Sequence, residues 1–202
     1  MDAVNPSRPT KIGHIHIPKT GGASIKRWMD VNGIDHVECG HKTFNEKKNL
    51  ADWWFTTVRN PYRRMVSFYE FFEKKAKKEL GWGRKPQRFP LYHKMLELYD
   101  KGFEKWLEGA PDVLWYFPMT QYQWITAEDG SQPDLIIKLE ELDQHWHILQ
   151  EKLGCHEPPY KINVTEKKKS SMADYYTPRA KQMVLDYFRE DFEQFGYDQD
   201  EI

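Results

Sequence analysis

One stretch, residues 12–26 (IGHIHIPKTGGASIK), constrains the fold of this chain more than any other. Its apolar, β-branched beginning predicts a strand over Ile12–Ile17, and the run Ala23–Val31 after the glycines predicts a helix. A strand that leads through glycines into a helix is a common anion site, because backbone N–H groups can approach the ligand and the helix N-terminus adds partial positive charge. Lys19 adds a full charge, so the stretch predicts a phosphate cradle.

The rest of the sequence predicts an α/β protein in which helices separate the strands. Further strands are expected at His36–Cys39, Trp53–Arg59 and Asp134–Glu140. Helices are expected at Asn45–Asp52, Tyr62–Leu80, Leu91–Glu108, Leu142–Leu153 and, with Thr177 as N-cap, from Pro178 to about Phe195. This alternation favours a P-loop-like, three-layer fold with a central, mainly parallel sheet flanked by helices. The aromatic segment 111–125 predicts no single element.

Composition and charge narrow the class of protein. The 202 residues are expected to form a single domain, with residues 1–10 as a loose leader. A formal net charge of -1 does not favour a nucleic-acid-binding surface, and the two cysteines do not suggest a disulfide framework. No signal peptide and no apolar run of about 18 residues is found. We therefore expect a cytoplasmic or otherwise soluble protein without membrane contact; the oligomeric state is not predicted.

The chemistry of the cradle can be tested against the P-loop of nucleoside triphosphatases, G-x-x-x-x-G-K-[ST]. Gly13, Lys19 and Thr20 fall in register, but Pro18 replaces the glycine before the lysine. Proline has no N–H to donate and cannot adopt a positive φ. The next long strand ends in Arg59, where an ATPase needs a carboxylate for magnesium. The pattern therefore argues for a second anion rather than a metal.

Two motifs resemble the donor-binding elements of sulfotransferases that use 3′-phosphoadenosine 5′-phosphosulfate (PAPS). Residues 18–24 (PKTGGAS) resemble the loop that binds the 5′-phosphosulfate, and residues 58–69 (VRNPYRRMVSFY) resemble the strand–turn–helix that binds the 3′-phosphate. The pattern is most similar to the carbohydrate sulfotransferases that include heparan sulfate 2-O-sulfotransferase, with further support at 40–44 (GHKTF) and 165–168 (TEKK). The resemblance implies transfer of a sulfuryl group from PAPS to a hydroxyl-bearing acceptor, a glycan or small molecule, with PAP as product.

The resemblance also assigns the donor site. Lys19 and the loop after it would hold the 5′ end, and Thr20 and Ser24 would add hydroxyl donors. The guanidinium of Arg59 would donate paired hydrogen bonds to the 3′-phosphate, assisted by the hydroxyl of Ser67. A polar loop before the last helix is expected to close over the nucleotide. The predicted donor-binding residues are Lys19, Thr20, Gly21, Gly22, Ala23, Ser24, Arg59, Ser67, Thr165, Lys167 and Lys168.

Sulfuryl transfer needs a cation at the bridging oxygen, where charge develops, and a base for the acceptor hydroxyl. Lys19 is expected to fill the first role. His41 is expected to be the base, because it follows a short strand and a glycine and falls where the 2-O-sulfotransferases place a catalytic histidine. Those enzymes tend to show another histidine two residues earlier, where this chain has Cys39. Glu140 and Glu38 are alternative bases, since other sulfotransferases use a glutamate.

Two other functions stay open. A P-loop kinase or nucleotide hydrolase is disfavoured by Pro18 and by the lack of a magnesium carboxylate, and a binding module without catalysis is disfavoured by the presence of both Lys19 and His41. No metal centre is expected, because the histidines of the first strand and Cys39 show neither C-x-x-C nor H-x-x-x-H spacing.

Overall fold

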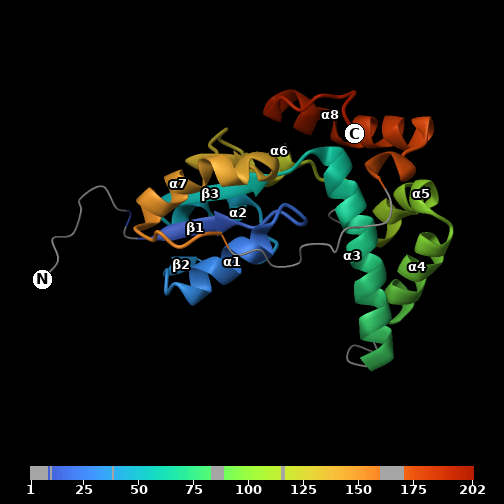
Figure 1. The fold of residues 1–202 in the computed structure, drawn as a ribbon, viewed down its shortest axis with the longest axis horizontal. Helices are drawn as coiled ribbons and strands as arrows, with labels where there is room; N and C mark the ends of the chain where they lie inside the picture. Colours follow the sequence, from blue (N-terminus) through green and yellow to red (C-terminus); the bar gives the residue numbers. More distant parts are fainter. Residues whose placement is uncertain (1–8, 10, 38, 83–88, 115–116, 160–170) are drawn as a thin grey trace, which may run out of the picture. The chain divides into compact units, whose positions relative to one another are not determined.

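A computed structural model describes residue 9 and residues 11–37, 39–82, 89–114, 117–159 and 171–202 (Figure 1). Nearly all of the expected leader lies outside the described residues, as do Glu38, Thr165, Lys167 and Lys168. The chain divides into two compact units. The sheet unit comprises Met1–Arg59 and Gln121–Glu166, and the helical unit comprises Asn60–Thr120 and Lys167–Ile202.

The sheet unit contains a four-stranded sheet in the order β2-β1-β3-β4. Its strands are β1 (Ile12–Ile15), β2 (His36–Val37), β3 (Trp53–Val58) and β4 (Leu135–Lys138). Each pairing in this sheet is parallel, with Ile12 opposite both His36 and Trp53, and Phe55 opposite Leu135. β1 and β3 occupy the two central positions and are buried along their whole length, as expected of strands covered on both faces. The predicted parallel α/β sheet is confirmed.

Helices cover both faces of the sheet. α1 (Gly22–Val31) and α7 (Leu142–Leu153) share the face to which Phe55 points, where the rings of Trp28 and Trp146 meet edge to face at 4.7 Å. Trp54 points to the opposite face, since successive side chains of a strand alternate. There it contacts Phe44 of α2 (Phe44–Lys47) at 5.8 Å between ring centroids. The three-layer arrangement is thereby confirmed. The unit is completed by α6 (Gln121–Ile125) and by the 3₁₀ turns η1 (Lys48–Leu50) and η3 (Leu139–Glu141).

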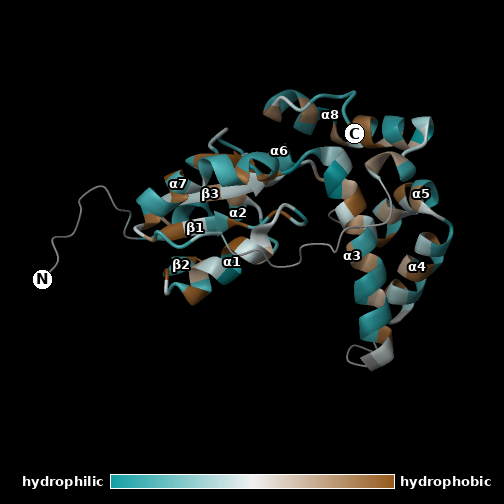
Figure 2. Cartoon of the chain, in the orientation of Figure 1, coloured by the Kyte–Doolittle hydropathy of each residue, from teal (hydrophilic) through white to brown (hydrophobic). Residues whose placement is uncertain are grey.

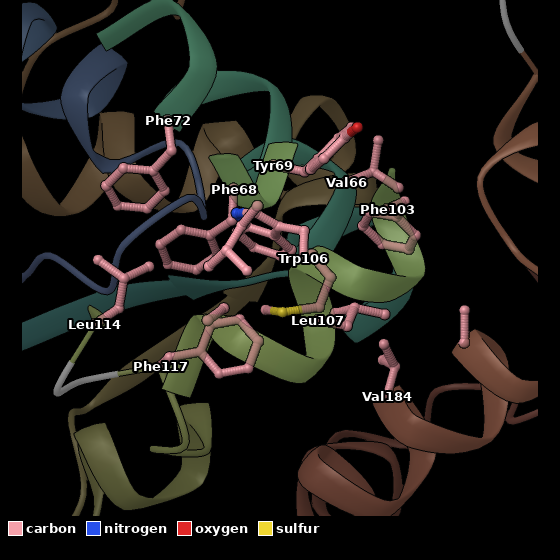
Figure 3. Close-up of a cluster of buried hydrophobic side chains, with 14 of the residues drawn as sticks. Val66, Phe68, Tyr69, Phe72, Phe103, Trp106, Leu107, Leu114, Phe117 and Val184 are labelled. Carbon is pink, nitrogen blue, oxygen red and sulfur yellow. The ribbon is translucent and has the colours of Figure 1, made fainter. Parts of the chain in front are cut away.

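The helical unit packs around an aromatic core (Figure 3). Phe68 and Phe72 stack at 5.8 Å between ring centroids, and Trp106 meets Phe117 edge to face at 5.5 Å. Many of the chain's aromatic residues therefore serve packing, in which each large ring buries much apolar area. The elements are α3 (Pro61–Trp82), α4 (Phe89–Asp100), α5 (Phe103–Val113), η4 (Met172–Asp174) and α8 (Pro178–Phe195).

One predicted helix is wrong. The expected single helix over 91–108 is two helices, because Gly102 adopts φ 90 between α4 and α5 and so ends the regular helical path. The last helix is confirmed with its cap, since Thr177 Oγ1 accepts a hydrogen bond from Ala180 N at 3.1 Å.

Figure 2 shows the hydrophilic C-terminal part of α3, where Lys74, Lys77 and Lys78 are exposed. Within the described residues, no helix combines the length and the apolar character needed to span a bilayer.

Candidate active site

The candidate residues of the sheet unit all follow the carboxyl ends of its strands. The cradle, residues 18–24, follows β1; His41 comes shortly after β2; Arg59 follows β3 directly; and Glu140 lies in η3 after β4. Because the four strands are parallel, these ends meet at one edge of the sheet. Ligands of open α/β sheets bind outside this edge. The topology therefore gathers motifs that lie far apart in the sequence.

Positive backbone φ angles shape the cradle. Lys19 has φ 72 and Gly21 has φ 90. The left-handed region costs a residue with a Cβ about 1–2 kcal/mol, and such strain is typical of functional loops. Arg59 stabilises the strained peptide, since its Nη1 donates to the Lys19 carbonyl oxygen at 3.3 Å. The first predicted motif is thus joined to the second by a direct contact.

Thr20 anchors the cradle to the sheet. Its side chain is fully buried, and its Oγ1 donates to the Ile17 carbonyl oxygen at 3.0 Å. Thr57 of β3 donates in turn from its Oγ1 to the Thr20 carbonyl oxygen at 2.8 Å. In this structure the Thr20 hydroxyl therefore donates its proton within the loop, and Thr20 stays a predicted donor-binding residue.

Close packing at Gly22 and the positive φ at Gly21 favour glycine at these two positions of the cradle. A Cβ at Gly22 would lie 2.3 Å from Cδ2 of His16, and a Cβ at Gly21 would lie 2.7 Å from Cδ1 of Leu139. Gly21 is the N-cap of α1 and has no side chain to cover the first turn. The first N–H groups of a helix carry its positive end, and of these groups Ser24 N donates to the Gly21 carbonyl oxygen at 2.9 Å. With Ala23 exposed and Ser24 half-buried on this turn, the start of α1 suits an anion.

We expect Gly22→Ala to lower the free energy of unfolding by about 1–3 kcal/mol, because the new methyl group overlaps the His16 ring. Urea unfolding measures the change. Gly81→Ala is the matched control, since Gly81 lies in α3 with open space around its Cβ position. That control is expected to be neutral or stabilising by up to about 1 kcal/mol. Equal stability of Gly22→Ala and the wild type would contradict the close contact between Gly22 and the His16 ring.

Arg59 is held by a residue that the sequence does not single out. Gln121, fully buried at the start of α6, accepts a hydrogen bond from Arg59 N through Oε1 and donates through Nε2 to Arg59 O, both at 2.8 Å. This pair of bonds fixes the backbone from which the guanidinium extends. A lone glutamine in an aromatic segment carries no sign of a partner 62 positions earlier.

Three histidine rings lie in a row beside the cradle. The ring centroids of His41 and His16 are 5.1 Å apart, those of His16 and His14 are 6.1 Å apart, and His14 stacks on Phe55 at 4.8 Å. His41 is exposed, so it is not a core histidine. Because His16 also packs on Gly22, the contact between the rings places His41 close to the start of α1.

Burial lowers the pKa values of the two inner histidines. The pKa of His16 falls to about 4, first through burial and then through the positive charges of His41, Lys19 and Lys26. Burial, followed by the charges of His16 and His36, also holds the pKa of His14 well below its usual value. Both rings are therefore neutral near pH 7. His41 is the exposed ring of the row and the one that an acceptor can reach.

Three further residues differ in how well they suit this chemistry. Ser67 is half-buried in the second turn of α3 and belongs to the helical unit. Burial raises the pKa of the Cys39 thiol to about 11, so this side chain stays protonated and is not a base. Glu140 is exposed in η3, next to the leucine that packs on Gly21, and stays an alternative base. The described part of the chain holds no group of three or more metal-ligating side chains.

The fold is that of an α/β protein in which Lys19, Arg59 and the exposed His41 lie at the same edge of the sheet as the start of α1, and this edge is a candidate anion site. The model of the sulfotransferase family matches residues 4–198, which span both units. The chain therefore belongs to the sulfotransferase family, and this membership supports a transferase that moves sulfuryl groups to a hydroxyl-bearing acceptor. A search of curated proteins and a search of solved structures returned no match.

Proposed function

We propose that this protein transfers the sulfuryl group of PAPS to a hydroxyl of a carbohydrate or a related small molecule. The observation that carries the proposal is the contact between Arg59 Nη1 and the Lys19 carbonyl oxygen at 3.3 Å. It joins two cationic residues, one on the loop after β1 and one at the end of β3. Two adjacent anion-binding elements suit a nucleotide with a 5′-phosphosulfate and a separate 3′-phosphate better than one with a single phosphate chain.

Each group of the site has a role in this proposal. The backbone of Thr20–Ser24 holds the 5′ end of the donor, and the Arg59 guanidinium pairs with the 3′-phosphate. Ser67 of α3, together with Thr165, Lys167 and Lys168, completes the donor-binding set. PAPS supplies an activated sulfuryl group, and the protein has to bind it, orient it and stabilise the leaving oxygen. The family match spans both units, which supports treating residues 1–202 as one catalytic domain.

The reaction is an in-line displacement at sulfur. His41 takes the proton of the acceptor hydroxyl while its oxygen bonds to sulfur, and the bond between sulfur and the bridging phosphate oxygen breaks. Lys19 stabilises the negative charge that develops on that bridging oxygen, and PAP leaves. The exposure of His41 supports this role, because the acceptor has to approach from solvent. The lysine, the arginine and the helix N–H groups supply the positive charge that this chemistry needs.

Calorimetry with PAP, and separately with ATP and magnesium, tests the donor class. We expect PAP to bind without magnesium, and Arg59→Ala to weaken its binding by about 10- to 100-fold through loss of a charge-assisted contact. Arg27→Ala is the control, since Arg27 is exposed on α1 outside the cradle, and it should bind PAP normally. A preference for ATP with magnesium would favour a kinase or nucleotide hydrolase instead.

A further inference from the structure

His16 has no role in the proposed mechanism, yet it contacts both parts of the site. Its ring lies against Gly22, where a Cβ would be 2.3 Å from its Cδ2 and 2.8 Å from its Nε2. On its other side the ring centroid lies 5.1 Å from that of His41. The imidazole therefore stands between the first residue of α1 and the proposed base.

The charged groups that lower the pKa of His16 are cationic, and one of them, Lys26, is paired with Asp30 at 3.0 Å. The cationic groups come from three elements: Lys19 from the cradle, Lys26 from α1 and His41 from the segment after β2. The neighbouring ring on β1, His14, is buried and neutral. Burial and these positive charges together keep His16 unprotonated near pH 7 while no anion is bound. The same charges make the start of α1 attractive to a phosphate group.

We propose that His16 is part of the anion site and takes up a proton from solvent when a phosphate group occupies the cradle. The identity of that anion rests on the proposed function. A dianion at the N–H groups of Gly22 and its neighbours places negative charge beside a ring that otherwise faces positive charge. An opposite charge within about 4–6 Å raises the pKa of an imidazole by about 1–3 units. The protonated ring then adds a further cationic contact to PAP, so PAP binds more tightly as the pH falls towards about 6.

Nuclear magnetic resonance of the protein with labelled histidine side chains tests the proposal directly. The signal of the His16 ring is assigned by its loss in His16→Gln or, if that variant folds poorly, in His16→Phe. It is then followed from about pH 4 to about pH 8 without ligand and with saturating PAP. We expect the midpoint of its titration to rise by at least about one pH unit in the complex. An unchanged midpoint in a complex that demonstrably forms would overturn the proposal.

Two further measurements separate His16 from its neighbours and from the donor assignment. Calorimetry of PAP binding in buffers of different ionisation enthalpy gives the net proton uptake, which should fall in His16→Gln and persist in His41→Gln. Uptake that is lost only in His41→Gln would assign the proton to His41 and overturn the role of His16. If PAP does not bind while inorganic sulfate or phosphate still shifts the His16 midpoint, then the proposed donor fails and the proton-linked anion site stands.

Discussion

Lys19→Ala is expected to lower the rate of sulfuryl transfer by about 100- to 1,000-fold, the range found when one stabiliser of transition-state charge is removed. The ammonium group acts on a bridging oxygen that becomes fully charged only as the bond to sulfur breaks. Most of the loss should therefore appear in kcat, with a smaller change in PAP affinity. Initial rates with labelled PAPS measure the first quantity, and calorimetry with PAP measures the second. Lys11→Ala, an exposed lysine before β1 at the opposite edge of the sheet, should retain the wild-type rate.

A second variant separates the charge of Lys19 from its strained backbone. Lys19→Gly also lacks the ammonium group but relieves the left-handed conformation at φ 72. We expect it to transfer sulfuryl groups as poorly as Lys19→Ala while being about 1 kcal/mol more stable to urea than that variant. Stability and activity would then change independently, which excludes unfolding as the cause of the lost rate. A wild-type rate in either variant would remove Lys19 from the proposed mechanism.

Local chemistry accounts for the elements that the sequence predicts well. α7 begins at Leu142 and ends before Gly154, and α8 starts after Thr177, because capping residues and a left-handed glycine act within a few positions. The break at Gly102 is local too, yet the apolar period continues across it and favours one long helix. The apolar periodicity therefore predicts the helical content of this segment correctly but misses the boundary between α4 and α5. A single glycine inside a helical pattern is compatible with one continuous helix and with two separate helices.

The candidate site also contains residues that local motifs predict and contacts that only the tertiary structure reveals. The cradle and the segment around Arg59 are contiguous motifs, so their residues could be named from the sequence. Contacts between elements could not be named. The pairing of Gln121 with Arg59 depends on where α6 meets the end of β3, and the contact between His16 and His41 depends on the pairing of β1 with β2. The hydroxyl of Thr20 shows the limit most simply, because a threonine can donate to a ligand or to its own loop, and here it donates to the loop.

His41→Ala is expected to reduce kcat by about 100- to 10,000-fold, the contribution of a well-placed general base. Affinity for PAP should change by less than about threefold, because the proposed contacts of His41 are with the acceptor hydroxyl and not with the nucleotide. Rates with saturating PAPS and calorimetry with PAP separate the two effects. His147→Ala is the matched control, since His147 is an exposed histidine on α7 of the same unit, and it should leave both quantities unchanged.

Three outcomes of this experiment assign different roles to His41. Loss of turnover with normal PAP binding supports His41 as the base. Normal turnover in His41→Ala shifts the role to another residue, and Glu140→Gln then tests the carboxylate that follows β4 at the same edge of the sheet. Loss of turnover together with PAP binding assigns His41 a part in holding the nucleotide. Because His41 contacts His16, and His16 packs on Gly22, such coupling would act through the row of rings beside the cradle.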